Sequence, residues 1–255
     1  MRKQKIAISL SKELLENIDR RVDGKSVRSR SQYIETMIRK GMELQSAQKA
    51  VIMLRKEHHA VALSRFKNGT LLSSQADFLS RHGVSEILIV TQKGPQLAEL
   101  ESYAQRMEHP AKIIVTDKAG NADALKCVKD RMDSNFVVLS GDVYNDFDLK
   151  KMMEKHAQKG VMMTMALMSR ASPSKYGNVI LDGDMVVSFQ EKPSSAVSHL
   201  VNAGLYVFSP AVFSAMEGCH FLEKELFPKL ASMRQLTGYF TMGDYYHAQE
   251  SSPRP

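Results

Sequence analysis

Residues 135–143 read NFVVLSGDV, an apolar run that ends in a small and acidic segment. The run predicts a buried strand over residues 135–139, with Ser140, Gly141 and Asp142 at its carboxyl end. Ligands of parallel sheets gather at the carboxyl ends of strands. This stretch therefore predicts an α/β sheet with Asp142 at its functional edge.

The surrounding chain alternates strands with helices. The predicted elements are strands over residues 50–54, 86–91 and 112–115, and helices over 74–81 and 121–132. Such alternation indicates a largely parallel sheet. The sequence thus predicts an α/β domain over residues 47–255 with a mixed, mostly parallel sheet.

A series of motifs in this region closely resembles the sugar-1-phosphate nucleotidyltransferases, which make nucleotide-diphosphate sugars from a nucleoside triphosphate. In chain order the motifs are LSGDV (139–143), DFDL (146–149), YGNV (176–179), FQEKP (189–193), LVNAGLYVF (200–208) and EKELFP (223–228). The resemblance spans residues 49–245. It implies a Rossmann-like, glycosyltransferase-A-type fold.

The resemblance also implies ligand-binding positions. Asp142 would hold a magnesium ion that bridges the phosphates, and Asn121 lies where the family has a nucleotide-contacting loop. The remaining positions would contact the sugar and its phosphate: Tyr176, Gly177, Glu191, Lys192, Asn202 and Gly204.

The sequence departs from the family at the triphosphate. The family's first loop needs glycines so that backbone amides approach the phosphates, whereas residues 54–59 read LRKEHH and no glycine occurs between Gly41 and Gly69. Thr241 takes the place of a second metal-binding aspartate. Removing one such stabilising group costs about 100- to 1000-fold in rate. We therefore expect no catalytic residues, no required cofactor and at most weak magnesium at Asp142.

Residues 1–46 read as a separate, basic module. They hold 11 Lys and Arg and six Asp and Glu, which gives +5 of the chain's formal +7. Period-two alternation predicts a strand over residues 5–10, and helical spacing predicts one helix after Ser11 and a second near Ser29. A strand and two helices this short bury too little alone, so we expect a homodimer or a higher even oligomer.

This order of elements resembles the ribbon-helix-helix family of DNA-binding proteins, over residues 3–43. The resemblance implies double-stranded DNA as a partner. The implied groove-facing residues are Lys3, Lys5, Ala7 and Ser9. The implied phosphate-contacting residues are Ser29, Arg30 and Ser31.

Other features narrow the class of protein. The chain has two cysteines, Cys127 and Cys219, which are far apart and show no metal-ligand pattern. We therefore expect no disulfide framework and a cytoplasmic localisation. The longest apolar run, residues 161–168, is too short to span a bilayer.

These observations favour a DNA-binding transcriptional regulator whose nucleotidyltransferase-like domain is inactive and senses a sugar phosphate or nucleotide sugar. One alternative is an active, divergent sugar-1-phosphate nucleotidyltransferase with a regulatory DNA-binding module. Another is a DNA-binding protein whose large domain is an interaction or dimerisation platform. The sequence does not identify an operator, a ligand or the sign of regulation.

Overall fold

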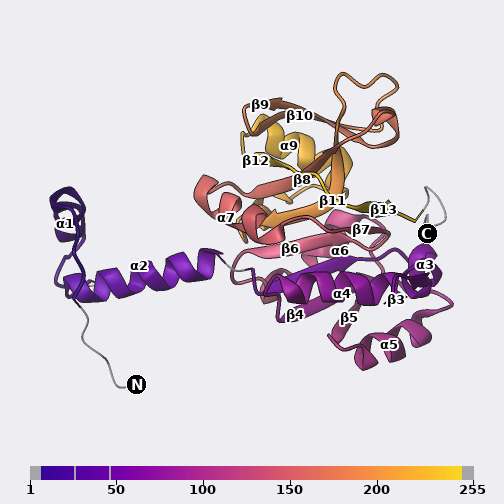
Figure 1. The fold of residues 1–255 in the computed structure, drawn as a ribbon, viewed down its shortest axis with the longest axis horizontal. Coiled ribbons are helices and arrows are strands. Elements are labelled where there is room, and N and C mark those ends of the chain that lie inside the picture. The colour runs from indigo at the N-terminus through magenta and orange to yellow at the C-terminus, as the bar shows by residue number, and fades with distance from the viewer. Residues whose placement is uncertain (1–6, 26, 46, 249–255) are drawn as a thin grey trace. The chain divides into compact units, whose positions relative to one another are not determined.

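A computed structural model describes residues 7–25, 27–45 and 47–248 (Figure 1). The chain divides into two compact units, Met1–Leu44 and Gln45–Pro255. No helix in the described ranges has the length and the hydropathy of a membrane span.

The described residues of the amino-terminal unit form the helices α1 (Lys12–Asp19) and α2 (Arg30–Gln45). The Leu14 amide donates to the Ser11 hydroxyl at 3.3 Å, so Ser11 is the N-cap that the sequence predicted. Residues 7–10 of the strand predicted over residues 5–10 form no strand, and Lys5 and Ile6 lie outside the described residues. Lys3, predicted to face a DNA groove, also lies outside them. The Arg30 guanidinium, expected to contact phosphates, instead donates two hydrogen bonds to the Asp19 carboxylate.

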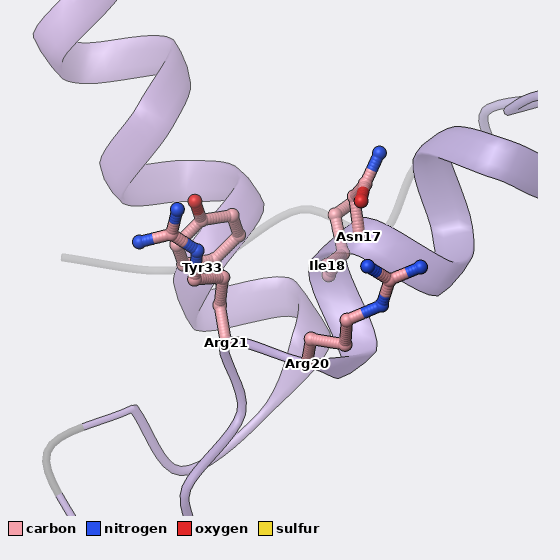
Figure 2. Close-up of a pocket in the computed structure, with 5 residues that line it drawn as sticks. All are labelled: Asn17, Ile18, Arg20, Arg21 and Tyr33. Carbon is pink, nitrogen blue, oxygen red and sulfur yellow. The ribbon is translucent and has the colours of Figure 1, made fainter.

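A hollow of about 250 Å³ lies between these two helices. Figure 2 shows its lining residues: Asn17, Ile18, Arg20, Arg21 and Tyr33. Ile18 is the buried residue of α1. The other four lining residues carry polar or charged groups, so this unit has little hydrophobic core between its two helices.

The larger unit is built on one nine-stranded sheet of order β5-β4-β1-β6-β11-β8-β12-β10-β9 (Figure 1). Its strands are β1 (Lys49–Met53), β4 (Glu86–Thr91), β5 (Ala111–Val115), β6 (Phe136–Ser140), β8 (Met163–Ser169), β9 (Gly177–Asp182), β10 (Met185–Glu191), β11 (Leu200–Phe208) and β12 (Leu236–Phe240). Two small sheets pair β2 (Arg65–Phe66) with β3 (Gly69–Thr70), and β7 (Val143–Asn145) with β13 (Tyr245–His247).

Helices cover both faces of the sheet, which explains why strands β1, β4, β6 and β8 are apolar along most of their length. In β1, Ala50 and Ile52 face one hydrophobic core and Val51 faces the other. The first core is closed by α3 (His59–Leu63), α4 (Leu71–Arg81), α5 (Leu97–Arg106) and α7 (Leu149–Lys159). The second is closed by α6 (Asn121–Lys126), α8 (Val212–Ala215) and α9 (Phe227–Ser232).

The sheet is mixed, as predicted, but it is less parallel than expected. Strands β5, β4, β1 and β6 pair in parallel, and so do β8 and β12. Strand β11 runs antiparallel to both β6 and β8, and β10 runs antiparallel to β9 and β12. The predicted helix over 121–132 is also shorter, since α6 ends at Lys126 and a separate one-turn 3₁₀ helix follows.

Candidate functional site

The segment after β1 carries the LRKEHH stretch. It forms a one-turn 3₁₀ helix, Lys56–His58, that continues into α3. The His59 ring is buried, with Nε2 2.7 Å from the Thr91 hydroxyl at the end of β4. A Cβ on Gly94 would lie 3.1 Å from that ring, so the space beside it is filled. The backbone here is a turn packed around a histidine and not an open cradle of amides.

Asp142 follows β6 and sits at the centre of this strand edge. Gly141 precedes it and packs against Leu54, the residue after β1. A Cβ on Gly141 would lie 2.7 Å from the Leu54 Cδ1 atom. The Asp142 side chain is 16% exposed, and its Oδ2 atom lies 3.4 Å from His58 Nδ1 and 3.8 Å from His247 Nε2. The carboxyl edge of the sheet therefore carries a nearly buried carboxylate that lies between two imidazoles, and we take it as the candidate cation-binding group.

The charge state of His58 matters for that centre. Burial lowers the pKa of the His58 imidazole, although the nearby Asp142 carboxylate opposes this effect. A neutral imidazole leaves the negative charge of Asp142 available to a cation.

The sugar-side motifs converge at the ends of β9 and β10. Gly177 pairs with Glu191 across the two strands, and a Cβ on Gly177 would lie 3.1 Å from the Glu191 Oε2 atom. The Lys192 amide donates to the Tyr176 carbonyl at 3.1 Å. Burial, and then the charge of Glu223, raise the pKa of the Glu191 carboxyl. These four predicted residues thus lie together.

A bulge in β11 holds the next pair. The strand slips register between Asn202 and Tyr206, where Gly204 adopts a φ of 72°. The Asn202 side-chain nitrogen Nδ2 donates to the Tyr206 hydroxyl at 2.7 Å, and its side-chain oxygen Oδ1 accepts from the Gly204 backbone amide at 2.9 Å. Burial is the main cause that raises the pKa of Tyr206, and the charges of Glu223 and Glu191 add to it. The bulge therefore holds Asn202 against the Tyr206 hydroxyl, on which the charge of Glu191 also acts.

Asn121 was expected in a nucleotide-contacting loop, but both ends of its side-chain amide bond to other residues of the chain. Its amide nitrogen donates to the Glu223 carboxylate at 2.8 Å, and its oxygen accepts from the Leu222 amide at 2.8 Å. Asn121 thus orients Glu223, whose charge reaches the sugar-side residues. Sequence reasoning quoted the EKELFP motif but did not single out Glu223.

The end of the family region also differs from the expected arrangement. The Thr241 hydroxyl donates to the Met242 carbonyl at 3.4 Å. His247 on β13 is the residue that approaches Asp142, because β13 pairs with β7 and brings the two side by side. Nothing in the local sequence pointed to His247, which lies 105 residues after Asp142 in the chain.

Comparisons with known proteins agree with this geometry. A sequence model of the Nucleotidyl transferase family matches residues 54–247. The chain belongs to this family. The match includes every segment around Asp142, Glu191 and Asn202.

Similar curated proteins carry names of sugar nucleotidyltransferases. The chain is 33% identical over 183 residues to the mannose-1-phosphate guanylyltransferase catalytic subunit beta of Danio rerio, which covers 68% of this chain and 51% of that protein. It is 30% identical over 189 residues to the mannose-1-phosphate guanyltransferase of Candida albicans, covering 69% and 52%. The chain spans about half the length of these relatives.

Solved structures show the same fold. A UDP-glucose pyrophosphorylase from Acinetobacter baumanii superposes with a TM-score of 0.67 at 16% identity, covering 80% of this chain and 89% of the other. HddC from Yersinia pseudotuberculosis, complexed with GMP-PN, superposes with a TM-score of 0.64 at 18% identity, covering 79% and 93%.

These findings overturn the interpretation as a DNA-binding regulator. The relatives are named for nucleotidyl transfer, and the predicted double-stranded DNA partner has no support in them, so the hypothesis of a transcriptional regulator with a sensing domain is wrong. Of the proposed DNA-contacting positions, Ala7 and Ser9 lie outside any strand, and Arg30 is already paired with Asp19. Ser29 and Ser31 flank the start of α2, where the Ser29 hydroxyl accepts from the Gln32 amide.

Proposed function

We propose that the chain is a divergent sugar-1-phosphate nucleotidyltransferase. A phosphate oxygen of the sugar 1-phosphate attacks the α-phosphorus of a nucleoside triphosphate, so that the nucleotide-diphosphate sugar forms and pyrophosphate leaves. The observation that supports this most is Asp142, a nearly buried carboxylate at the strand edge within the matched family region. Because the relatives are named for mannose 1-phosphate and guanylyl transfer, GTP and mannose 1-phosphate are the first substrates to test.

Enzymes of this family commonly use Mg²⁺. The donor set fits this ion, because Mg²⁺ is usually bound by one or two carboxylates, waters and substrate phosphates, and Asp142 supplies one carboxylate. Burial lowers the pKa of His58, which favours its neutral form and leaves the charge of Asp142 available to the ion. Asp142 would hold the ion, which would neutralise phosphate charge.

The other residues of the site would act on two sides, one that binds the triphosphate and one that binds the sugar. On the triphosphate side, Arg55 and Lys56 supply the positive charge that glycine-loop amides would otherwise supply. A contact of 3.3 Å between Arg55 Nη2 and His58 Nε2 positions the Arg55 guanidinium. On the sugar side, Asn202 and Glu191 offer hydrogen-bonding groups for sugar hydroxyls.

The side-chain cations are less preorganised than backbone amides. Losing one preorganised donor typically lowers the rate by about 100- to 1000-fold. We therefore expect kcat below about 1 s⁻¹, the lower end of the ordinary range for enzymes.

The test is pyrophosphate release from the full chain with GTP, mannose 1-phosphate and Mg²⁺. Asp142→Asn should lower kcat/KM by about 100-fold or more, because the carboxylate charge is removed without a change in size. The matched control is Asp130→Asn, an exposed acid in the one-turn helix Lys129–Arg131, which should leave the rate unchanged. The proposal fails if no nucleoside triphosphate and sugar 1-phosphate pair releases pyrophosphate, or if Asp142→Asn retains the parent's rate.

A further inference from the structure

Arg170 follows β8 directly, at a strand end beside the site. Its backbone is fixed by the neighbouring segment, since the Arg170 amide donates to the His199 carbonyl at 3.0 Å. The His199 Nδ1 atom lies 3.0 Å from the Arg170 carbonyl oxygen. The chain therefore holds the base of this side chain in one place.

The Arg170 guanidinium is held by aromatic rings. Its central carbon lies 4.7 Å from the ring centre of Tyr245 and 5.8 Å from that of Tyr176. Cation–π contacts of this kind orient the planar group while leaving its N–H edge able to donate.

One donor of the Arg170 guanidinium has no partner among the described residues. Its Nε atom is buried and has no hydrogen-bond partner, and within residues 7–25, 27–45 and 47–248 no carboxylate lies at salt-bridge distance from it. A buried donor on a permanent cation without a partner is unfavourable. Arg170 as a whole is partly exposed, so the oxyanion of a ligand can approach the outer nitrogens of the guanidinium.

The position of Arg170 indicates which oxyanion of a substrate it would bind. Tyr245 and His247 lie on the same face of β13, about 7 Å apart, since alternate residues of a strand share a face. His247 contacts Asp142 at 3.8 Å, so Arg170 stands near the Asp142 side of the site. Its other neighbour, Tyr176, is bonded through its carbonyl to the Lys192 amide, next to Glu191. Arg170 therefore lies between Asp142 and the sugar-side residues.

We propose that Arg170 binds the 1-phosphate of the sugar substrate through its guanidinium edge. In the proposed reaction this phosphate must sit between the sugar and the α-phosphorus, and Arg170 occupies that intermediate position. Its planar fork of donors matches the oxygens of a phosphate. The inference rests on the proposed function for the identity of the sugar phosphate, whereas the anion site itself rests on the contacts of Arg170.

The test measures equilibrium binding to the full chain by calorimetry, without any nucleoside triphosphate. The probes are mannose 1-phosphate, inorganic phosphate and mannose. Arg170→Gln should weaken mannose 1-phosphate binding by about 10- to 100-fold, the range for hydrogen bonds to charged groups. Arg170→Lys should keep part of the affinity, because the charge remains and the fork is lost. The matched control, Arg131→Gln, removes an exposed arginine near the amino-terminal end of β1 and should bind like the parent.

Melting temperatures of all variants separate a binding effect from a folding effect. Because Arg170→Gln loses only the contacts with the two tyrosine rings, it should melt within about 4 °C of the parent. Inorganic phosphate should lose affinity in parallel with mannose 1-phosphate, and mannose should show no dependence on residue 170. Equal mannose 1-phosphate affinity in the parent and in a folded Arg170→Gln protein overturns the inference, as does the absence of mannose 1-phosphate binding to the parent.

The two proposals fail in different ways. If mannose 1-phosphate binding depends on Arg170 but no pyrophosphate is ever released, the anion site stands and the enzymatic function falls. If pyrophosphate is released and Arg170→Gln has the parent's KM for mannose 1-phosphate, the function stands and the site falls.

Discussion

Gly204 shows how one residue shapes the site. Its φ of 72° is a left-handed conformation, and a Cβ there would lie 3.1 Å from Val143 Cγ2 and 3.3 Å from the Ser140 side chain. The bulge that it allows also places Asn202. A glycine is therefore required for conformation and for close packing at the same position.

We expect Gly204→Ala to lower the free energy of unfolding by about 2–4 kcal/mol, the sum of left-handed strain and overpacking. The matched control is Gly183→Ala, where φ is 61° and nothing lies within 4 Å of the added Cβ. The control should lose only about 1–2 kcal/mol, from backbone strain alone. Urea denaturation measures both values, and equal losses would show that packing around Gly204 contributes nothing.

Helix α7 carries a buried titratable group that ties stability to pH. His156 is 2% exposed, and its Nδ1 atom lies 2.9 Å from the Thr164 hydroxyl of β8, which in turn lies 2.9 Å from Thr237 of β12. Burial lowers the pKa of His156 to about 4 from its ordinary value of 6.5. The unfolded chain therefore takes up this proton at a higher pH than the folded chain does.

The sign follows from that difference. The contribution of neutral His156 to stability is fully present above pH 6.5 and is lost as the pH falls from there toward about 4, by about 3 kcal/mol in total. His156→Gln keeps a hydrogen-bonding group but cannot titrate, so its free energy of unfolding should fall less over this range. Urea denaturation at pH 7, 5.5 and 4.5 gives the comparison. Parallel curves for the parent and for His156→Gln would contradict the assignment.

At the scale of the whole molecule, the two hydrophobic cores use residues from Ala47 onward. Unit Met1–Leu44 contributes no described residue to either core. We therefore propose that Gln45–Pro255 folds by itself as the nucleotidyltransferase domain, close to the predicted division between residues 46 and 47.

A shortened chain of residues 45–255 should keep a melting temperature within about 4 °C of the full chain, which corresponds to about 1 kcal/mol at this size. It should also release pyrophosphate at the same rate per molecule. Circular dichroism and the pyrophosphate assay check the two statements. An unfolded or inactive shortened chain would show that the first 44 residues take part in the fold or in the site.

The amino-terminal unit shows a limit of sequence patterns. The spacing of Leu14, Leu15 and Ile18 predicted a helix, and α1 confirms it. The same pattern did not reveal what the helices are for, because amphipathic helices with basic side chains suit many partners. The DNA-binding hypothesis therefore inferred a specific partner from a pattern that does not specify one.

Local sequence was enough for several elements and for the resemblance to the family. Apolar runs predicted β1, β4 and β6, and the ordered motifs predicted the nucleotidyltransferase fold and singled out Asp142, Glu191 and Asn202. These features are short-range, because strand periodicity and a turn after a strand are written in consecutive residues.

Tertiary structure alone decided which distant side chains join them. The pairing of β13 with β7 brings His247 to Asp142, and the end of β8 sets Arg170 beside Tyr245. Asn121 likewise turns Glu223 toward the site from 102 residues away in the chain. Each contact depends on strand order and register, which arise from packing the two faces of the sheet and leave no mark on the neighbouring sequence.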